Sequence, residues 1–269
     1  MIALDLDPLN SANFIRVSQT ALAGLTNLNF KRLKSIDISN NIYLQSIEFP
    51  RLTWVSGYVS IMNNHIESSL SSPKLTKIDG KLSLSGVSKL DVPALNIING
   101  AINIMEDGFK EFSFEGLETA SSDLYIIRNA KLAKFAFPKL NKIGGALLIQ
   151  NNTLLKDIDN NFFPQLTEMS GKMLFTGPFD SIKLPNFKKT SGAISIESSG
   201  RLSCTETKRR IDFTSKNRWV CYSNGYKFYE QEKKSELQES LAMKYSTSLF
   251  GLVDVGIALF LLMVAGVFL

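Results

Sequence analysis

The chain has 269 residues, of which 44% are hydrophobic and 20% are charged, and its formal net charge is +5. This composition excludes an intrinsically disordered chain, which combines low hydrophobicity with high net charge. Residues 1–200 carry 20 basic and 18 acidic side chains, so this part lacks the basic stripe that follows a phosphate backbone, and we expect no nucleic-acid partner.

Residues 1–30 precede the first clear repeat and predict an N-terminal cap, built as a poor helix or a degenerate coil. The opening MIALDLDPLNSANF has neither a basic flank nor the apolar run of a secretory signal. Two interpretations remain open. Either the start of the chain is missing and the protein is exported, or the protein is inserted by its tail alone with the repeats in the cytosol.

Residues 31–200 repeat one phrase, seen most clearly in FPRLTWVSGYVSIMNN from Phe49 and FPKLNKIGGALLIQNN from Phe137. Counted from the proline or its equivalent, successive copies are 20 to 26 residues apart. A unit of this length predicts a stacked solenoid, because one unit cannot bury its apolar side without neighbours.

Within each unit, two apolar residues recur at positions +9 and +11 after the proline, as in Leu147 and Ile149. A spacing of two places both on one face of a β-strand. Glycine at +7 suits either a turn with positive φ or a close backbone approach. Proline marks the corner after a preceding strand, since it cannot donate to a central ladder. We therefore predict an all-β, parallel β-solenoid whose inward residues form columns.

Asparagine follows the +11 strand in several units, as in Asn40–Asn41, Asn63–Asn64 and Asn151–Asn152. Asparagine tolerates the left-handed conformation and bonds nearby backbone, which favours a corner that contacts the next coil. Asn151-Asn152-Thr153 is also the one N-x-S/T sequon of the chain, which makes Asn151 the predicted glycosylation site.

Residues 201–226 contain both cysteines, Cys204 and Cys221, and predict a C-terminal cap. In an oxidising compartment a disulfide between them would contribute about 3 kcal/mol, and two free buried thiols are the alternative. Their spacing does not match a zinc site. The cluster Lys208, Arg209 and Arg210 is interpreted as solvated surface.

Residues 227–248 form a charged spacer, and residues 249–269 are apolar except for Asp254. A helix of this length matches a hydrocarbon core of about 30 Å. The apolar stretch lacks the basic flank usual for a spanning helix, which favours a signal replaced by a glycolipid anchor, with Ser240 as the candidate attachment site. A true transmembrane helix and a buried core helix are the alternatives.

Few residues suggest catalysis. The single histidine, His65, has no metal-ligand or nucleophile partner in sequence and is interpreted as a surface turn residue. The carboxylates Asp157 and Asp159, and the adjacent pair Glu106 and Asp107, are candidates for a glycosidase pair. The outward positions +8 and +10 show no acidic row, although Tyr58 and Tyr125 are candidates for stacking on sugar rings. We expect neither a metal nor a cofactor.

The repeated phrase, the closing cysteine pair and the apolar end together resemble the fungal GPI-anchored cell-wall organisation and sporulation-specific wall proteins. The resemblance covers residues 20–225 and implies the receptor L-domain, a leucine-rich right-handed β-helix. It also implies a glycosylated protein without catalytic activity, on the outer face of the plasma membrane and in the cell wall.

The sequence therefore predicts a protein without enzyme activity that supports fungal cell-wall or spore-wall organisation. Its partners would be wall polysaccharide or wall proteins, with the membrane bound through the tail. The alternative is a membrane-anchored, receptor-like module with a specific ligand. A glycan-active enzyme is a third hypothesis, and it rests on Asp157 and Asp159.

Overall fold

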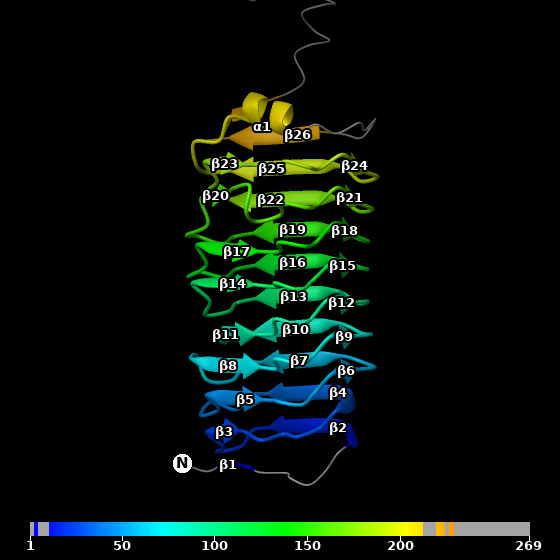
Figure 1. Ribbon diagram of the computed structural model, residues 1–269. Helices are drawn as coiled ribbons and strands as arrows, with labels where there is room; N and C mark the ends of the chain where they lie inside the picture. Colours follow the sequence, from blue (N-terminus) through cyan, green and yellow to red (C-terminus); the bar gives the residue numbers. More distant parts are fainter. Residues whose placement is uncertain (1–2, 5–10, 212–218, 224–225, 229–269) are drawn as a thin grey trace, which may run out of the picture. The chain divides into compact units, whose positions relative to one another are not determined.

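The computed structural model describes residues 3–4, 11–211, 219–223 and 226–228. Residues 1–227 form one compact unit. In this unit the chain winds into a parallel β-solenoid of about nine turns, with one short helix among the described residues (Figure 1). The predicted fold class is thus confirmed. The predicted spacer and hydrophobic tail lie almost wholly outside the described residues, and within the described part no helix is both long and apolar enough to cross a bilayer.

One side of the solenoid is a sheet of eighteen described strands, in which the register from β2 to β26 is parallel; the coils from β6 to β25 each contribute a short strand and then a longer one, whereas β2 and β4 are each one continuous strand. The strands are β2 (Ser11–Ser18), β4 (Arg32–Ser39), β6 (Trp54–Val55), β7 (Val59–Met62), β9 (Lys77–Ile78), β10 (Leu82–Ser85), β12 (Ile97–Ile98), β13 (Ile102–Met105), β15 (Thr119–Ala120), β16 (Leu124–Ile127), β18 (Lys142–Ile143), β19 (Leu147–Gln150), β21 (Glu168–Met169), β22 (Met173–Gly177), β24 (Lys189–Thr190), β25 (Ile194–Ser198), β26 (Trp219–Ser223) and β27 (Tyr226–Phe228).

The return path of each coil carries narrower sheets. The first has five described strands, and two further pairs continue the stack. These strands are β1 (Ala3–Leu4), β3 (Gly24–Leu25), β5 (Ser46–Glu48), β8 (Ser68–Ser71), β11 (Val87–Asp91), β14 (Glu111–Ser113), β17 (Lys134–Ala136), β20 (Asp157–Ile158) and β23 (Ser181–Ile182).

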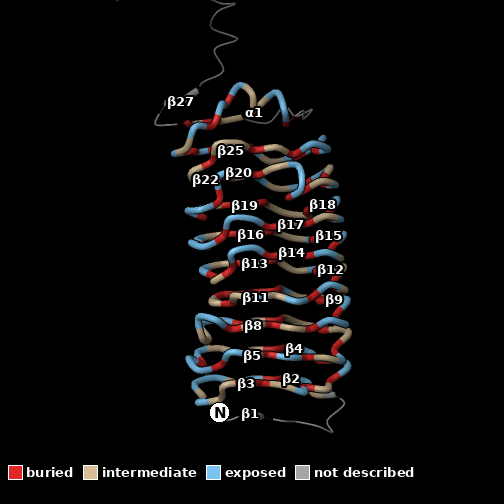
Figure 2. Tube along the Cα trace, turned by 60° about the vertical axis from the view of Figure 1, so that its left-hand side comes forward, coloured by how far each residue is buried: buried red, intermediate tan, exposed pale blue. Residues whose placement is uncertain are grey.

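The core lies between these two sides, and the buried residues run through every coil (Figure 2). The register pairs each +9 residue with the +9 residue of the next coil, as in Leu124 with Leu147, and each +11 residue likewise, as in Ile126 with Ile149. All four are completely buried. The alternation in the sequence therefore correctly identified the inward columns, because a one-residue slip would expose every one of these side chains.

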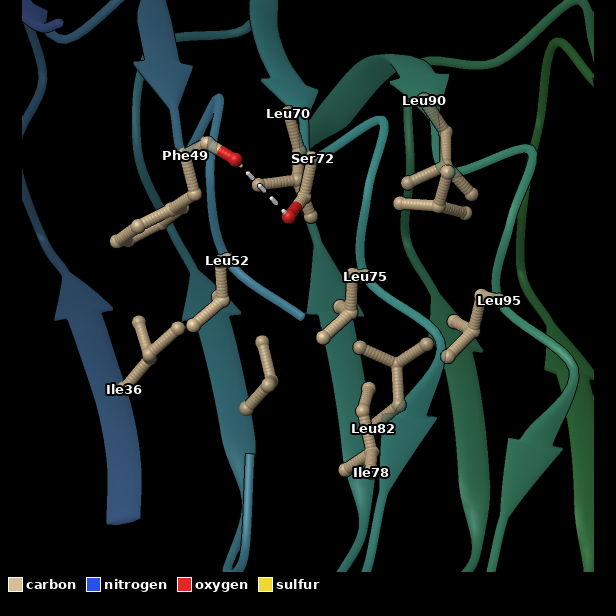
Figure 3. Close-up of a pocket in the computed structure, with 12 residues that line it drawn as sticks. Ile36, Phe49, Leu52, Leu70, Ser72, Leu75, Ile78, Leu82, Leu90 and Leu95 are labelled. Atoms are coloured by element: carbon tan, nitrogen blue, oxygen red, sulfur yellow. Dashed lines mark hydrogen bonds between the residues drawn. The ribbon is translucent and has the colours of Figure 1, made fainter. Parts of the chain in front are cut away.

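Phenylalanine rings stack along the solenoid axis in the C-terminal coils. Phe114, Phe137 and Phe163 lie in one column with ring centroids 5.2 and 5.4 Å apart. Aromatic pairs of this kind contribute about 0.5–1.5 kcal/mol beyond the burial of their area. The same column holds Ser72 and Val92 in earlier coils, and a small apolar void lies there among leucine and isoleucine side chains (Figure 3).

Glycine at +7 is required by close approach. Among the described glycines only Gly86 has a positive φ, at 78°. The Gly80 N–H donates to the Gly57 carbonyl at 2.7 Å, and the Gly171 N–H donates to the Gly145 carbonyl at 2.9 Å. A Cβ on Gly171 would lie 2.5 Å from backbone atoms of the preceding coil. The sequence left two roles open for the +7 glycines, a turn with positive φ and a close backbone approach. The structure shows the close approach.

Asparagine builds a ladder at the corner after the long strand. Asn40, Asn63 and Asn151 have φ between 54° and 58°. The residue after each points inward, and so does Asn129 in the intervening coil. The Asn129 side-chain amide donates to the Ile104 carbonyl at 3.0 Å, and the Asn129 Oδ1 accepts the backbone N–H of Asp107 in the previous coil. The predicted contact between corner asparagines and the neighbouring coil is confirmed.

Asp107 occupies one position of this asparagine ladder. Its Oδ1 accepts the Val87 N–H at 2.7 Å, as a ladder asparagine would. Its Oδ2 stands where asparagine carries an amide nitrogen, and it has no hydrogen-bond partner among the described residues. The residue is buried, and this burial raises the pKa of the Asp107 carboxyl to about 8. Protonated, the carboxyl regains a donor at the amide position.

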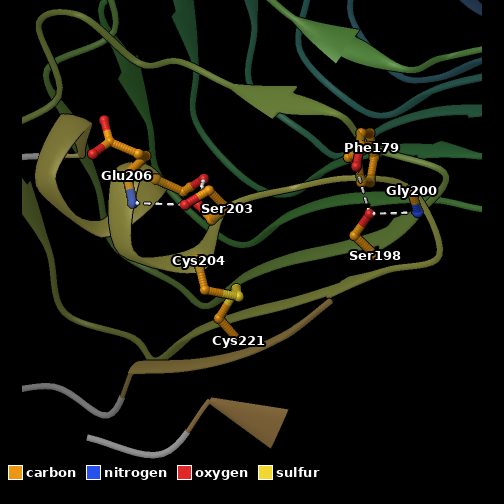
Figure 4. Close-up of a disulfide and its surroundings, with 8 residues drawn as sticks. Phe179, Ser198, Gly200, Ser203, Cys204, Glu206 and Cys221 are labelled. Carbon is orange, nitrogen blue, oxygen red and sulfur yellow. Dashed lines mark hydrogen bonds between the residues drawn. A yellow bond between two sulfur atoms is a disulfide. The ribbon is translucent and has the colours of Figure 1, made fainter. Parts of the chain in front are cut away.

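The described part of the stack closes on α1 (Cys204–Arg210), whose Ser203 cap accepts the Glu206 N–H at 3.3 Å (Figure 4). A disulfide joins Cys204 to Cys221 on β26, with the two Cα atoms 5.9 Å apart, so neither thiol is free. Arg209 bonds the Glu206 carboxylate at 2.7 Å on the helix surface.

At the other end, residues expected to form the N-terminal cap contribute coil strands. β2 pairs in parallel with β4 from Ser11 to Ser18, and β3 pairs with β5. Ile15 and Leu25 are buried in the common core. Of the two forms predicted for this cap, the described residues adopt the coil. The domain boundaries at 30/31, 200/201, 226/227 and 248/249 stay predictions.

Candidate functional site

The large sheet presents a continuous solvent-facing side, which we call the outer face. Side chains alternate along each strand, so the residue between two buried ones points outward. In β16, Tyr125 and Ile127 are partly exposed while their neighbours are buried. Parallel register then brings equivalent outward residues from successive coils to within about 4.8 Å per coil. The variable positions of the repeat therefore form the surface of the outer face.

The N-terminal end of the outer face carries a basic–aromatic cluster. We define it as Phe14, Arg32, Lys34, Trp54, Tyr58, Lys77 and Lys81, from the coils of β2, β4, β6–β7 and β9–β10. Arg32, Trp54 and Lys77 are direct register partners in one column. The Arg32 guanidinium lies 5.3 Å from the Trp54 ring centroid, and the Lys77 ammonium lies 5.9 Å from it. These are cation–π distances.

A second group of rings and cations lies beside the first column. The Lys34 ammonium lies 5.6 Å from the Phe14 ring, and the Lys81 ammonium lies 5.9 Å from the Tyr58 ring. Phe14 is 51% exposed, which is unusual for phenylalanine. Each ring of the cluster thus lies within cation–π distance of at least one cation.

Asp79 fixes the first column. Its carboxylate accepts the Trp54 indole N–H at 2.7 Å, the Lys77 ammonium at 2.8 Å and the Asn99 amide at 2.9 Å. The hydrogen bond from Lys77, with those from Trp54 and Asn99, holds the pKa of the Asp79 carboxyl below its usual value. Asp79 stays ionised and sets the direction of the indole ring.

The C-terminal half of the outer face is more apolar. Leu148 and Leu174 are register partners, and both are partly exposed. The Tyr125 hydroxyl donates to Asp123 at 2.7 Å, and this bond raises the pKa of the tyrosine. Tyr58 and Tyr125 come from coils separated by those of β10 and β13, so about 14 Å of stacking separates them. They do not form one stacking site.

The four carboxylates that the sequence offered for catalysis lie in two parts of the solenoid. Asp107 belongs to the buried ladder, whereas Glu106 is exposed and bonded to Arg128 at 2.7 Å. Asp159 accepts the Asn161 N–H at 2.7 Å within its own turn, and Asp157 is exposed on β20. Asp107 is thus buried, whereas Glu106 and Asp157 are exposed.

The remaining predicted site residues are dispersed. His65 accepts the Glu67 N–H at 3.1 Å, which is a turn contact. Within the described ranges, no three histidine, cysteine, aspartate or glutamate side chains gather as metal ligands would. Asn151 is exposed at its corner. Ser240 and the apolar stretch 249–269 lie outside the described residues.

Two features of the surface were missed in the sequence. The basic–aromatic cluster was one, although Trp54 and Lys77 share one offset from the repeat proline, and Tyr58 and Lys81 share another. The other is an apolar corner after β4 and β7, where Ile42, Tyr43 and Ile66 are 63%, 57% and 66% exposed. Their signal was apolar residues placed one or two positions after the asparagine pair, and Leu154, which is 55% exposed, stands at the equivalent place after Asn151–Asn152.

Searches for similar proteins give fungal surface and sporulation proteins. The chain is 28% identical over 204 residues to a cell surface GPI-anchored protein of Arthroderma benhamiae, a match covering 76% of this chain and 52% of that protein. It is 31% identical over 194 residues to sporulation-specific protein 2 of Saccharomyces cerevisiae, covering 71% of this chain and 38% of that protein. It is 28% identical over 214 residues to protein ecm33 of Aspergillus fumigatus, covering 79% and 52%.

The matched region thus spans about half or less of the length of these relatives. None of the three names is that of an enzyme. No family model matches the chain, and no solved structure matches it significantly.

Proposed function

We propose that this chain, a homologue of the fungal GPI-anchored cell-surface and sporulation-specific proteins, acts without catalysis in the organisation of the fungal cell wall or spore wall. The observation that carries the proposal is the outer face, a long exposed sheet whose outward side chains change from coil to coil. Such a surface is suited to holding an extended partner. The similarity to a protein named as GPI-anchored supports a place on the outer face of the plasma membrane and in the wall.

The chemistry of the described residues agrees with a binding role. The buried asparagines and Asp107 belong to the ladder that joins the coils, and Glu106 and Asp159 are bonded to nearby partners. A glycosidase would need two carboxyl groups held about 5–9 Å apart across one bond. We infer that Asp157 and Asp159 are surface residues of a long coil and not catalytic groups.

The test uses the full chain in its own fungus. Deletion of the gene should weaken the wall or the spore wall, and the parent chain and the Asp157→Ala, Asp159→Ala double variant should restore it equally. Purified full chain should release no reducing ends from wall glucan. Turnover of glucan that disappears in the double variant would refute the absence of catalysis, and an intact wall after deletion would refute the role itself.

The position in the cell has separate tests. We propose that Ser240 accepts a glycolipid anchor and that Asn151 carries an N-linked glycan. A glycolipid-specific phospholipase should release the protein from membranes, and Ser240→Leu should prevent that release. Removal of N-glycans should shift the parent on a gel but not the Asn151→Gln variant. Protein that resists the phospholipase and stays in the membrane would favour a true membrane helix.

One observation favours the second candidate, a receptor-like binding module. Ile127, Leu148 and Leu174 form a partly exposed apolar band on the outer face. Apolar patches of this kind are common where a protein partner docks. Leu148→Lys combined with Leu174→Lys should abolish binding of such a partner in the receptor-like case. The same pair should leave wall integrity unchanged in the wall-organising case.

A further inference from the structure

We propose that the basic–aromatic cluster binds an anionic glycan, a sugar polymer that carries phosphate or carboxylate groups. The inference rests on the proposed function, because it takes a wall polymer as the partner of the outer face. It adds the place on that face and the chemical class of the polymer. Both follow from the rings that lie beside cations over the first coils.

The first step is the charge. The cluster presents Arg32, Lys34, Lys77 and Lys81, and one carboxylate, Asp79, lies among them. Farther along the same column Glu168 lies in register between Lys142 and Lys189, and it faces Lys142 at 3.9 Å. The outer face over the first coils thus carries a net positive charge, although the repeats as a whole are nearly neutral. A site of this sign raises the local concentration of an anionic partner.

The second step is the rings. Cations alone would serve any anion, whereas rings interleaved with cations suit a ligand with apolar and charged parts in alternation. The carbon–hydrogen surface of a sugar packs against an aromatic side chain, and its acidic group reaches the neighbouring ammonium or guanidinium. Trp54 is well suited, because Arg32 and Lys77 flank its ring from the two adjacent coils. The Trp54 indole N–H donates to the Asp79 carboxylate, so the ring is held in its orientation before any ligand binds.

The third step is the shape. The first column and the group beside it run along the stacking axis and advance by about 4.8 Å per coil. The described residues of the cluster come from four successive coils, from β2 to β10. The surface is therefore an extended strip and not a closed pocket. An extended polymer fits it better than a single sugar phosphate does.

The experiment compares polymers that share a backbone. Full chain is titrated with dextran phosphate, carboxymethyl-dextran and unmodified dextran, and with polyphosphate as a chain of charge without sugar. Trp54 emission reports binding at the cluster itself, in a Trp219→Phe background that removes the other tryptophan. We expect binding to one or both charged dextrans, weakening as salt shortens the screening length, and none to unmodified dextran. The phosphate and carboxylate polymers distinguish the two sources of charge.

Two double variants separate the cluster from general surface charge. Lys77→Ala with Lys81→Ala should weaken binding of the charged dextran about tenfold, or about 1.4 kcal/mol. The matched control, Lys142→Ala with Lys172→Ala, removes the same charge from the same columns farther along and should change affinity less than about twofold. Tyr58→Leu should weaken binding of the charged dextran but not of polyphosphate. Melting temperatures establish that each variant is folded.

Equal losses in the two double variants would overturn the inference, and so would equal affinity for charged and unmodified dextran. Tighter binding of polyphosphate or of a single-stranded oligonucleotide would point to a different partner and overturn it as well. If full chain still restores the wall but binds neither charged dextran, only this inference fails. If it binds charged dextran but the deletion leaves the wall intact, the proposed function fails instead.

Discussion

Asp107→Asn should stabilise the solenoid at neutral pH and remove a large part of the pH dependence of its stability. The aspartate holds an asparagine position in the ladder, and its Oδ2 has no hydrogen-bond partner among the described residues. Asparagine places an amide donor there. By register, that donor would reach the Leu84 carbonyl, as the Asn129 amide reaches the Ile104 carbonyl of its own preceding coil.

The direction with pH follows from linkage. The pKa of Asp107 is about 8 in the folded chain, against 3.8 for an ordinary aspartate. Between these values the folded state holds a proton that the unfolded state has lost, so stability falls as pH rises. The full contribution is present below about pH 4 and has gone above about pH 8. At 1.36 kcal/mol per pKa unit, the cost of the aspartate is about 4 kcal/mol at pH 7.

The assay is thermal or denaturant unfolding of parent and variant from pH 4 to pH 9. The two should be nearly equal at pH 4, and at pH 7 the variant should melt about 10 °C higher, since 1 kcal/mol corresponds to about 2–4 °C at this size. The difference between the proteins isolates Asp107 from other carboxylates. Glu106→Gln is the control, because that neighbouring carboxylate is exposed and paired with Arg128. A parent as stable at pH 8 as at pH 4, or an equal gain from Glu106→Gln, would refute the reasoning.

Three further substitutions test the stack by thermal melts. Gly145→Val should lower the free energy of unfolding by about 1–3 kcal/mol, because a Cβ there would meet the Asp123 N atom at 2.8 Å; an unchanged melting temperature would contradict the close-approach role. Asn129→Ala should cost about 2–3 kcal/mol, since it leaves buried backbone groups unpaired, and a loss no larger than that of an exposed alanine substitution would count against the ladder. Cys221→Ser should cost about 3 kcal/mol, and reductant should have the same effect on the parent but none on the variant.

The inward side of the fold could be predicted because its apolar residues recur periodically in the sequence. Leu147 and Ile149 recur with the same spacing in each unit, and stacking leaves one face on which they can be buried. The same periodicity located the asparagine corner. It did not choose between positive φ and close approach for Gly145, because that choice depends on the backbone of the preceding coil. The periodicity also did not show that Asp107 replaces an asparagine. The repeat unit that contains Asp107 is poorly conserved in pattern, so its alignment with the other units requires the strand register seen in the structure.

The outer face was harder to predict because the sequence there does not repeat. Trp54 and Lys77 occupy the same offset in successive units, yet a change from tryptophan to lysine looks like random drift when each unit is considered alone. The parallel register places the two residues side by side, with the Lys77 ammonium 5.9 Å from the Trp54 ring centroid. Tyr58 and Tyr125 differ in their surroundings for the same reason, because Tyr58 lies beside Lys81 and Tyr125 is bonded to Asp123.

The same reasoning indicates where function is carried in a stack of this kind. Inward leucines, the +7 glycines and the ladder asparagines are constrained by the neighbouring coil, so a change at any of them costs stability. Outward positions carry no such constraint. At each of them, the side chain of one coil lies beside the equivalent side chain of the next coil. A surface assembled in this way gains specificity by placing unlike residues in register, as Arg32, Trp54 and Lys77 are placed. Binding should therefore depend on the order of coils, and exchanging the outward residues of the β6–β7 and β18–β19 coils should move the affinity for charged polymer without changing the melting temperature.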